Sequence, residues 1–243
     1  MNKYYPIEAF HWAGMKDEHI EELRDILNVH PEYVNSTNKY GDNCLFIASK
    51  SGNIEIVKYL VEDAGANLDH VGDDGNALMV AISSRQYEIA DYLIDKGINI
   101  AAKSKNGSNV FHIVANIGNA DYIEKLLQID GGGLKIEELD NNKRHCLYNL
   151  ISSYSFHKDY YCFELIQSSI SDKVILGEDI KGVNVIDFAF NTQNEMIPKS
   201  NKNKVFDTDL NVQEGLVVNT NIARVKLLTP LINVLKSRFN SFP

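Results

Sequence analysis

Long apolar runs, paired cysteines and catalytic signature motifs are all missing from this 243-residue sequence. No stretch approaches the roughly 20 apolar residues that a membrane-spanning helix needs, so we expect no contact with a membrane. The three cysteines, Cys44, Cys146 and Cys162, form no CxxC pair, which argues against a disulfide framework and fits a reducing compartment. GxSxG, Walker and dinucleotide-binding motifs are absent, so no cofactor and no familiar catalytic class is indicated.

Signals for metal, nucleic acid and secretion are missing as well. The seven histidines lack metal-ligand spacing such as HxxxH, so no metal site is predicted. The formal net charge of −9 disfavours binding to phosphate backbones and admits a basic partner. Residues 1–9 contain no basic segment followed by an apolar run. We therefore expect no secretory signal and a cytoplasmic location, or delivery into a host cytosol.

A 33-residue self-similarity is the strongest positive signal, and it is regular from residue 38 to residue 127. The aligned segments are YGDNCLFIASKSGNIEIVKYLV from Tyr40, DDGNALMVAISSRQYEIADYLI from Asp73 and NGSNVFHIVANIGNADYIEKLL from Asn106. Four columns keep the spacing: Leu45, Leu78 and Phe111; Ala48, Ala81 and Val114; Ile56, Ile89 and Tyr122; Leu60, Leu93 and Leu126. Chance does not keep four columns in register over three copies, so this is a tandem repeat.

The repeat resembles the ankyrin repeat, which has a turn, a TPLHxAA segment, a GN loop and a second helix that ends before a glycine. The nearest match is NVFH at 109–112 with GN at 118–119, and GN recurs at 52–53. Gly65 and Gly97 match the glycine that closes the second helix, where a left-handed residue is needed.

We therefore predict an all-α ankyrin-repeat solenoid of about five to six helix-turn-helix units with short β-turn tips, forming a single domain over residues 1–243. Neither helix pair can bury its apolar face alone, so stacking supplies the core. The predicted division is an N-terminal capping repeat (1–37), three regular repeats (38–130), divergent repeats (131–190), a polar insertion (191–218) and a C-terminal capping helix (219–243). Because caps hide both ends of the stack, we expect a monomer.

The repeat register assigns the reactive side chains to packing. One slot, which is usually proline in the ankyrin family, holds only small residues: Cys44, Ala77, Val110, Cys146 and Val185. His112 holds the family's histidine slot, where the ring usually hydrogen-bonds neighbouring turns. We therefore assign no catalytic residue.

The resemblance implies a non-enzymatic function, since ankyrin repeats bind a partner protein along the concave face made by turn tips and first helices. Transferring this role position by position gives a predicted partner-binding set. Its turn-tip members are Lys39, Tyr40, Asp42, Asp73, Asp74, Lys105, Asn106, Ser108, Asn142 and Arg144, and its helix members are Lys50, Ser84, Asn116 and Ile117. Tyr40 and Arg144 are of the types that most often dominate interface energy. The asparagine-rich composition favours a microbial source, with a role as a bacterial effector or as an adaptor or immunity protein.

An enzyme is the alternative hypothesis. Residues 140–243 depart from the repeat pattern, and Cys146, His157 or Cys162 would serve there as nucleophile and base. Burial of His157 and Cys162 in the helix stack, with no cleft beside them, would exclude this alternative.

Overall fold

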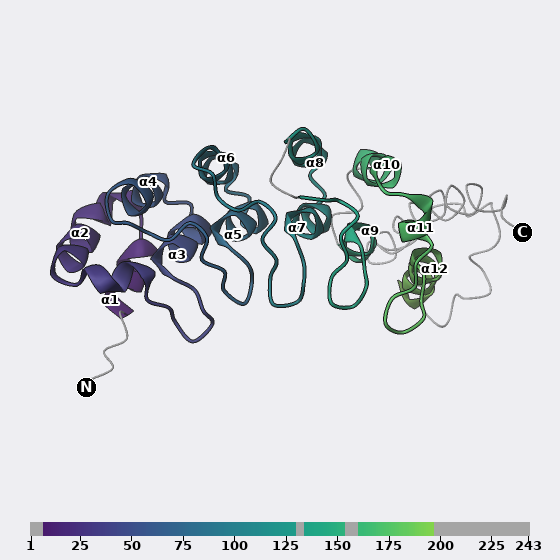
Figure 1. The fold of residues 1–243 in the computed structure, drawn as a ribbon, viewed down its shortest axis with the longest axis horizontal. Helices are drawn as coiled ribbons and strands as arrows, with labels where there is room; N and C mark the ends of the chain where they lie inside the picture. The colour runs from purple at the N-terminus through teal and green to yellow at the C-terminus, as the bar shows by residue number, and fades with distance from the viewer. Residues whose placement is uncertain (1–6, 130–133, 154–159, 197–243) are drawn as a thin grey trace, which may run out of the picture.

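The computed structural model describes residues 7–129, 134–153 and 160–196, which form a curved stack of helices (Figure 1). Two 3-10 helices, η1 (Asp17–His19) and η2 (Pro31–Asn35), accompany the α-helices. The α-helices are α1 (Ile7–Ala13), α2 (Ile20–Val29), α3 (Cys44–Ser51), α4 (Ile54–Glu62), α5 (Ala77–Ser83), α6 (Tyr87–Asp95), α7 (Val110–Ile117), α8 (Ala120–Leu127), α9 (Cys146–Ser152), α10 (Tyr160–Ser169), α11 (Asp172–Ile175) and α12 (Val185–Met196). Within these ranges no strand forms, and the predicted all-α solenoid is confirmed.

The helices are arranged in two rows. In Figure 1 the second helices α4, α6, α8 and α10 form the upper row, the first helices α3, α5, α7 and α9 lie beneath them, and loops project below. Each first helix packs on the first helix of the next unit, and α12 packs on α9. This inner row of first helices therefore carries most of the contact from unit to unit.

The repeat columns form the core of this stack. All members of the four aligned columns are buried, and so are the five residues in the slot that is usually proline. They belong to one continuous apolar cluster that runs from Ala9 to Ala189. Each fully buried leucine or isoleucine contributes about 2 kcal/mol to folding. The small side chains of Ala48 and Ala81, both fully buried, let adjacent first helices approach closely.

A buried asparagine starts each regular first helix. The Oδ1 atoms of Asn43, Asn76 and Asn109 accept hydrogen bonds from the backbone N–H groups of the residues three positions on, at 2.9, 3.1 and 3.3 Å. This bond satisfies one of the N–H groups that a helix start leaves open. The Nδ2 atoms of Asn76 and Asn109 also donate to the carbonyls of Asn99 and Lys135, at 2.9 and 3.2 Å. The cap therefore fixes the first helix to the loop that leaves the same unit.

The turn tips are joined by backbone hydrogen bonds from one unit to the next. The N–H groups of Asp73, Lys105, Asn141 and Ile180 donate to the carbonyls of Tyr40, Asp73, Asn106 and Asn142, at 3.2, 3.0, 2.9 and 3.0 Å. Gly41, Gly107 and Gly182 turn these tips with a left-handed backbone, whereas Lys143 holds the same position at φ 59°. The tips therefore form a continuous edge along the stack.

The structure differs from the sequence expectation at the C-terminal side. Helix α12 continues to Met196, so the segment predicted as an insertion from residue 191 begins as helix. The remainder of that segment and the predicted capping helix (219–243) lie outside the described residues. Among the residues described, no helix has the length and apolar character needed to cross a bilayer.

Replacing the cap of α5 tests its contribution to the stack. Asn76→Ala should lower the free energy of unfolding by about 2 kcal/mol, because both the cap and the hydrogen bond to the Asn99 carbonyl are lost. Urea denaturation followed by circular dichroism measures the change. Asn116→Ala, at an exposed helical position, is the control and should stay within about 0.5 kcal/mol. Equal effects of the two substitutions would contradict the role of the cap.

Candidate partner-binding groove

A pocket of about 270 Å³ lies where turn tips meet the first helices α3, α5 and α7. Five residues of the predicted partner-binding set line it together: Lys50, Asp73, Asp74, Asn106 and Ser108. The rest of the wall is formed by Met79, Val80, Ser83, Ser104 and Ile113. The pocket therefore combines polar turn tips with apolar side chains of the inner helix row.

Some charged residues around the pocket have an ion-pair partner among the described residues, and others do not. Lys105 Nζ lies 2.9 Å from Asp73 Oδ2, so this carboxylate already has a counter-ion on the next tip. In the described ranges no ion pair involves Asp74 or Lys50, and both side chains are exposed. One carboxylate and one ammonium group of the pocket thus remain open to a partner.

The first turn tip exposes an aromatic ring at the end of the groove. Tyr40 is 56% exposed, and Lys39 Nζ lies 4.7 Å from the centre of its ring. Asp42 is half-buried, and its Oδ2 accepts a hydrogen bond from Asn38 Nδ2 at 2.9 Å. Lys39 and Tyr40 are accessible, whereas Asp42 shapes its own turn.

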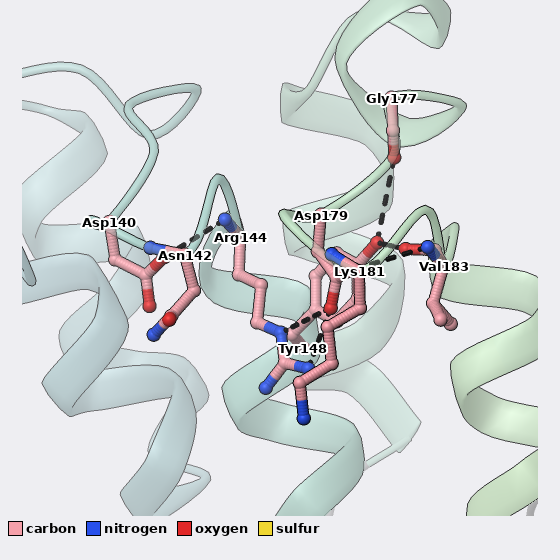
Figure 2. Close-up of polar contacts among 8 residues, drawn as sticks. All are labelled: Asp140, Asn142, Arg144, Tyr148, Gly177, Asp179, Lys181 and Val183. Carbon is pink, nitrogen blue, oxygen red and sulfur yellow. Dashed lines mark hydrogen bonds and ion pairs between the residues drawn. The ribbon is translucent and has the colours of Figure 1, made fainter.

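Arg144, predicted to contact a partner, makes its main polar contacts inside the chain. Figure 2 shows its side chain extended from its own turn to Asp179 on the next one. Its Nε and Nη2 atoms donate to Asp179 Oδ2 at 3.0 and 2.7 Å. The guanidinium carbon lies 5.4 and 5.0 Å from the ring centres of Tyr148 and Phe188. We therefore leave Arg144 out of the surface offered to a partner.

The acceptor of this ion pair is fully enclosed. The Asp179 side chain has no exposed area, and its Oδ1 accepts the N–H groups of Lys181 and Val183 at 2.8 and 3.1 Å. Burial opposes ionisation of the carboxyl, but the hydrogen bonds from Arg144 and the two N–H groups outweigh it and hold its pKa below the usual value. The Tyr148 hydroxyl adds a hydrogen bond to the Val183 carbonyl at 2.9 Å (Figure 2). The pair is a structural link between the turn that precedes α9 and the turn that precedes α12.

The other predicted positions are spread along the groove. Asn116 and Asn142 are exposed, and Ser84 is half-buried. Ile117, expected to face solvent, is half-buried and packs against the core. The structure does not bring these four residues into the pocket.

His112 has the structural role expected from its slot. It is buried, its Nε2 lies 3.0 Å from the Arg144 carbonyl, and its Nδ1 lies 3.2 Å from the Asn109 backbone nitrogen. Nδ1 also lies 2.6 Å from Asn109 Oδ1, so both ring nitrogens are held by polar groups of the neighbouring turns. Burial lowers its pKa, which favours the neutral ring.

His145 departs from the asparagine column because it occupies the cap position of α9. Its ring is buried and makes no capping hydrogen bond with the helix. It contacts the edge of Tyr148, with 5.0 Å between ring centres. Burial, reinforced by nearby His112, lowers its pKa from 6.5 to about 4.

All three cysteines are buried, and none of them forms a disulfide bond. Burial raises the pKa of Cys146 to about 12, so at neutral pH it is a protonated thiol and not a nucleophile. Cys162 is likewise fully buried, while His157 lies outside the described residues. In the part of the chain that is described, no group of His, Cys, Asp and Glu is placed to hold a metal ion.

The sequence interpretation missed the apolar wall of the pocket. Val80 and Ile113 are 33 residues apart and share a column with Ile47. Val80 is buried and the other two are half-buried, so the column lies at the margin of the core, and its repetition was a usable signal for the groove face. The asparagines at 43, 76 and 109 show the same spacing and were a usable signal for the caps.

Known proteins match the repeat region. Residues 10–104 match the family model described as ankyrin repeats, in three copies. Ankyrin repeat and SAM domain-containing protein 6 of Rattus norvegicus is 29% identical over 115 residues, which cover 47% of this chain and 13% of that protein. The E3 ubiquitin-protein ligase KEG of Arabidopsis thaliana is 31% identical over 93 residues, covering 37% and 6%. Putative ankyrin repeat protein L91 of Acanthamoeba polyphaga mimivirus is 31% identical over 123 residues, covering 46% and 19%.

In each case the chain spans less than a fifth of the relative's length. These relatives come from an animal, a plant and a virus, so they do not identify a bacterial origin. A chain of the solved complex of a predatory endopeptidase from Bdellovibrio bacteriovorus with an immunity protein has the same fold. Its TM-score is 0.61 at 21% identity, and the match covers 77% of this chain and 93% of that one.

Breaking the Arg144–Asp179 pair should destabilise the C-terminal units. Arg144→Gln leaves a buried carboxylate without its counter-ion, and we expect the free energy of unfolding to fall by about 3 kcal/mol in urea denaturation. Lys105→Gln breaks an exposed pair with Asp73 and is the control, with almost no expected change. A loss for Arg144→Gln no larger than for the control would show that the enclosed pair is dispensable.

Acidification should destabilise the protein through His145. The unfolded chain binds a proton at this residue near pH 6.5, whereas the folded chain keeps the ring neutral down to about pH 4. Stability is therefore complete above pH 6.5 and falls between pH 6.5 and 4, by up to about 1.4 kcal/mol per pH unit. Chemical denaturation at several pH values should show a shallower fall for His145→Asn than for the parent. His30→Asn, at an exposed position, should keep the parent slope; identical slopes in all three proteins would contradict this assignment.

Proposed function

Because the chain is an ankyrin-repeat protein, we propose that it binds a partner protein through the groove between its turn tips and first helices and catalyses no reaction. One observation carries the proposal. Five residues that the repeat register assigned to partner contact, from three separate units, line one pocket on the groove face. Ankyrin repeats form interaction modules, and this pocket gives the interaction a place on the chain.

The stiffness of the groove supports the same proposal. Its tips are joined by backbone hydrogen bonds, and its helices are fixed by buried asparagine caps. Groups that are already ordered lose little conformational entropy when a partner docks. The groove can therefore bind a folded or an extended partner without rearranging first.

The biological role takes one of two forms in this proposal. As an adaptor or immunity protein, the chain would bind the product of a neighbouring gene in its own cytoplasm. As an effector, it would bind host proteins in a host cytosol. In both forms we propose that the free chain is a monomer, which light scattering at micromolar concentration tests directly.

Removing the groove contacts should abolish partner binding. We expect the triple variant Tyr40→Ala, Asp74→Ala, Asn106→Ala to retain less than a tenth of the partner that the parent chain retains. The measurement is quantitative mass spectrometry after affinity purification, from host lysate and from cells that express the adjacent genes. The source of the retained partner separates the effector form from the adaptor or immunity form.

A matched triple variant on the opposite row provides the control. Glu88→Ala, Asp95→Ala and Asp121→Ala change exposed residues of α6 and α8, outside the groove. This variant should retain the partner at the parent level. Loss of the partner in the control, with retention in the groove variant, would place the binding surface on the outer helices and overturn the proposal.

A further inference from the structure

We propose that the pocket at the centre of the groove takes one basic side chain, lysine or arginine, from an extended segment of the partner, with Asp74 as its counter-ion. This inference rests on the proposed function and adds the chemistry of the partner. Three features support it: the volume of the pocket, the pairing of the charges around it, and the apolar residues of its wall.

The size of the pocket fits a single side chain. Its volume of about 270 Å³ lies below the range of about 300 to 1,000 Å³ that is typical of small-molecule sites. A partner helix would lie across the opening, whereas a side chain on an extended segment can enter. The polar turn tips on one wall match the backbone of such a segment.

Asp74 is the acceptor that the chain leaves open. Asp73 beside it is already paired with Lys105 at 2.9 Å. Asp74 is exposed, lines the pocket and has no ion pair within the described ranges. A cation that enters the pocket therefore gains a counter-ion without displacing one.

Charge beyond the pocket favours a cation over an anion. Within the pocket, Asp74 and Lys50 carry the charges without an ion-pair partner among the described residues, because Asp73 is paired with Lys105. An anion would pair with Lys50 but would come close to the Asp74 carboxylate. The net charge of −9 also concentrates cations around the chain. In addition, the pocket reaches Ser83, the last residue of α5, where helix carbonyls carry partial negative charge.

The apolar wall fits the stem of such a side chain. Met79, Val80 and Ile113 line the pocket alongside the charged residues. The methylene groups of lysine and arginine pack on apolar surface while the charged end reaches a polar group. A glutamate or aspartate side chain is shorter and would bring its charge close to these residues.

Peptide titrations test the proposal on the full chain. The probes are the tripeptides N-acetyl-Gly-Arg-Gly-amide and N-acetyl-Gly-Glu-Gly-amide, added to the isotope-labelled protein and followed by backbone amide chemical shifts. We expect the arginine peptide to shift the amides of Asp74, Ser83 and Asn106, and the glutamate peptide to leave them unchanged.

Two charge variants should change the affinity for the arginine peptide in opposite directions. Asp74→Asn should weaken binding about fivefold, the upper end expected for one exposed ion pair. Lys50→Glu should strengthen it, because the only cation of the wall is replaced by a third carboxylate. Asp95→Asn, on the outer face of α6, is the matched control and should leave the affinity unchanged.

Several outcomes would overturn the inference. These are an absence of shifts at the pocket amides with the arginine peptide, equal shifts with the glutamate peptide, or equal affinities of Asp74→Asn and Asp95→Asn. The alanine triple variant tests partner binding in the groove independently of the peptide titrations. If it loses the partner while the arginine peptide fails to bind, the proposed function stands and the basic side chain is wrong.

Discussion

A single helix pair of this chain cannot remove its apolar face from water, and the rest of the architecture follows from that constraint. Each unit completes its core on the next one, through first helices that touch along the inner row. The small residues Ala48 and Ala81 keep those helices close. Close helices place successive turns within hydrogen-bonding distance, which produces the continuous edge of tips. The groove is thus a consequence of stacking and requires no separate domain.

The parts of the structure that could be predicted from sequence are those that repeat. Leu45, Leu78 and Phe111 could be identified as core because the same environment recurs every 33 residues. Arg144 could not be interpreted in this way. Its contact with Asp179 joins residues 35 positions apart, and only the fold shows that the Asp179 carboxylate is enclosed. Likewise, the end of α12 depends on local helix propensity beyond the repeat, so its extension to Met196 left no periodic signal.

The candidate groove, too, could be predicted from the sequence only where it depends on the repeat. The register placed Asp74 and Asn106 on the face that carries the pocket, because their positions in the turn fix the direction of the side chains. Whether an exposed charge is free or already paired depends on distances between units, which the register does not contain. The pairing of Asp73 with Lys105 is one such case, and it determines which carboxylate of the pocket is open. The electrostatic character of the groove therefore required the structure.

Arg144 takes part in two neighbouring interfaces of the stack at once. Its carbonyl lies 3.0 Å from His112 Nε2 of the preceding unit, and its guanidinium binds Asp179 of the following turn. Descriptions of repeat proteins usually treat each interface as an independent term that depends only on the two units it joins. Here one residue enters two such terms, so the interfaces on either side of α9 are energetically coupled. Loosening the unit that contains Asp179 and α12 would therefore weaken packing two units away, through the backbone of a single turn.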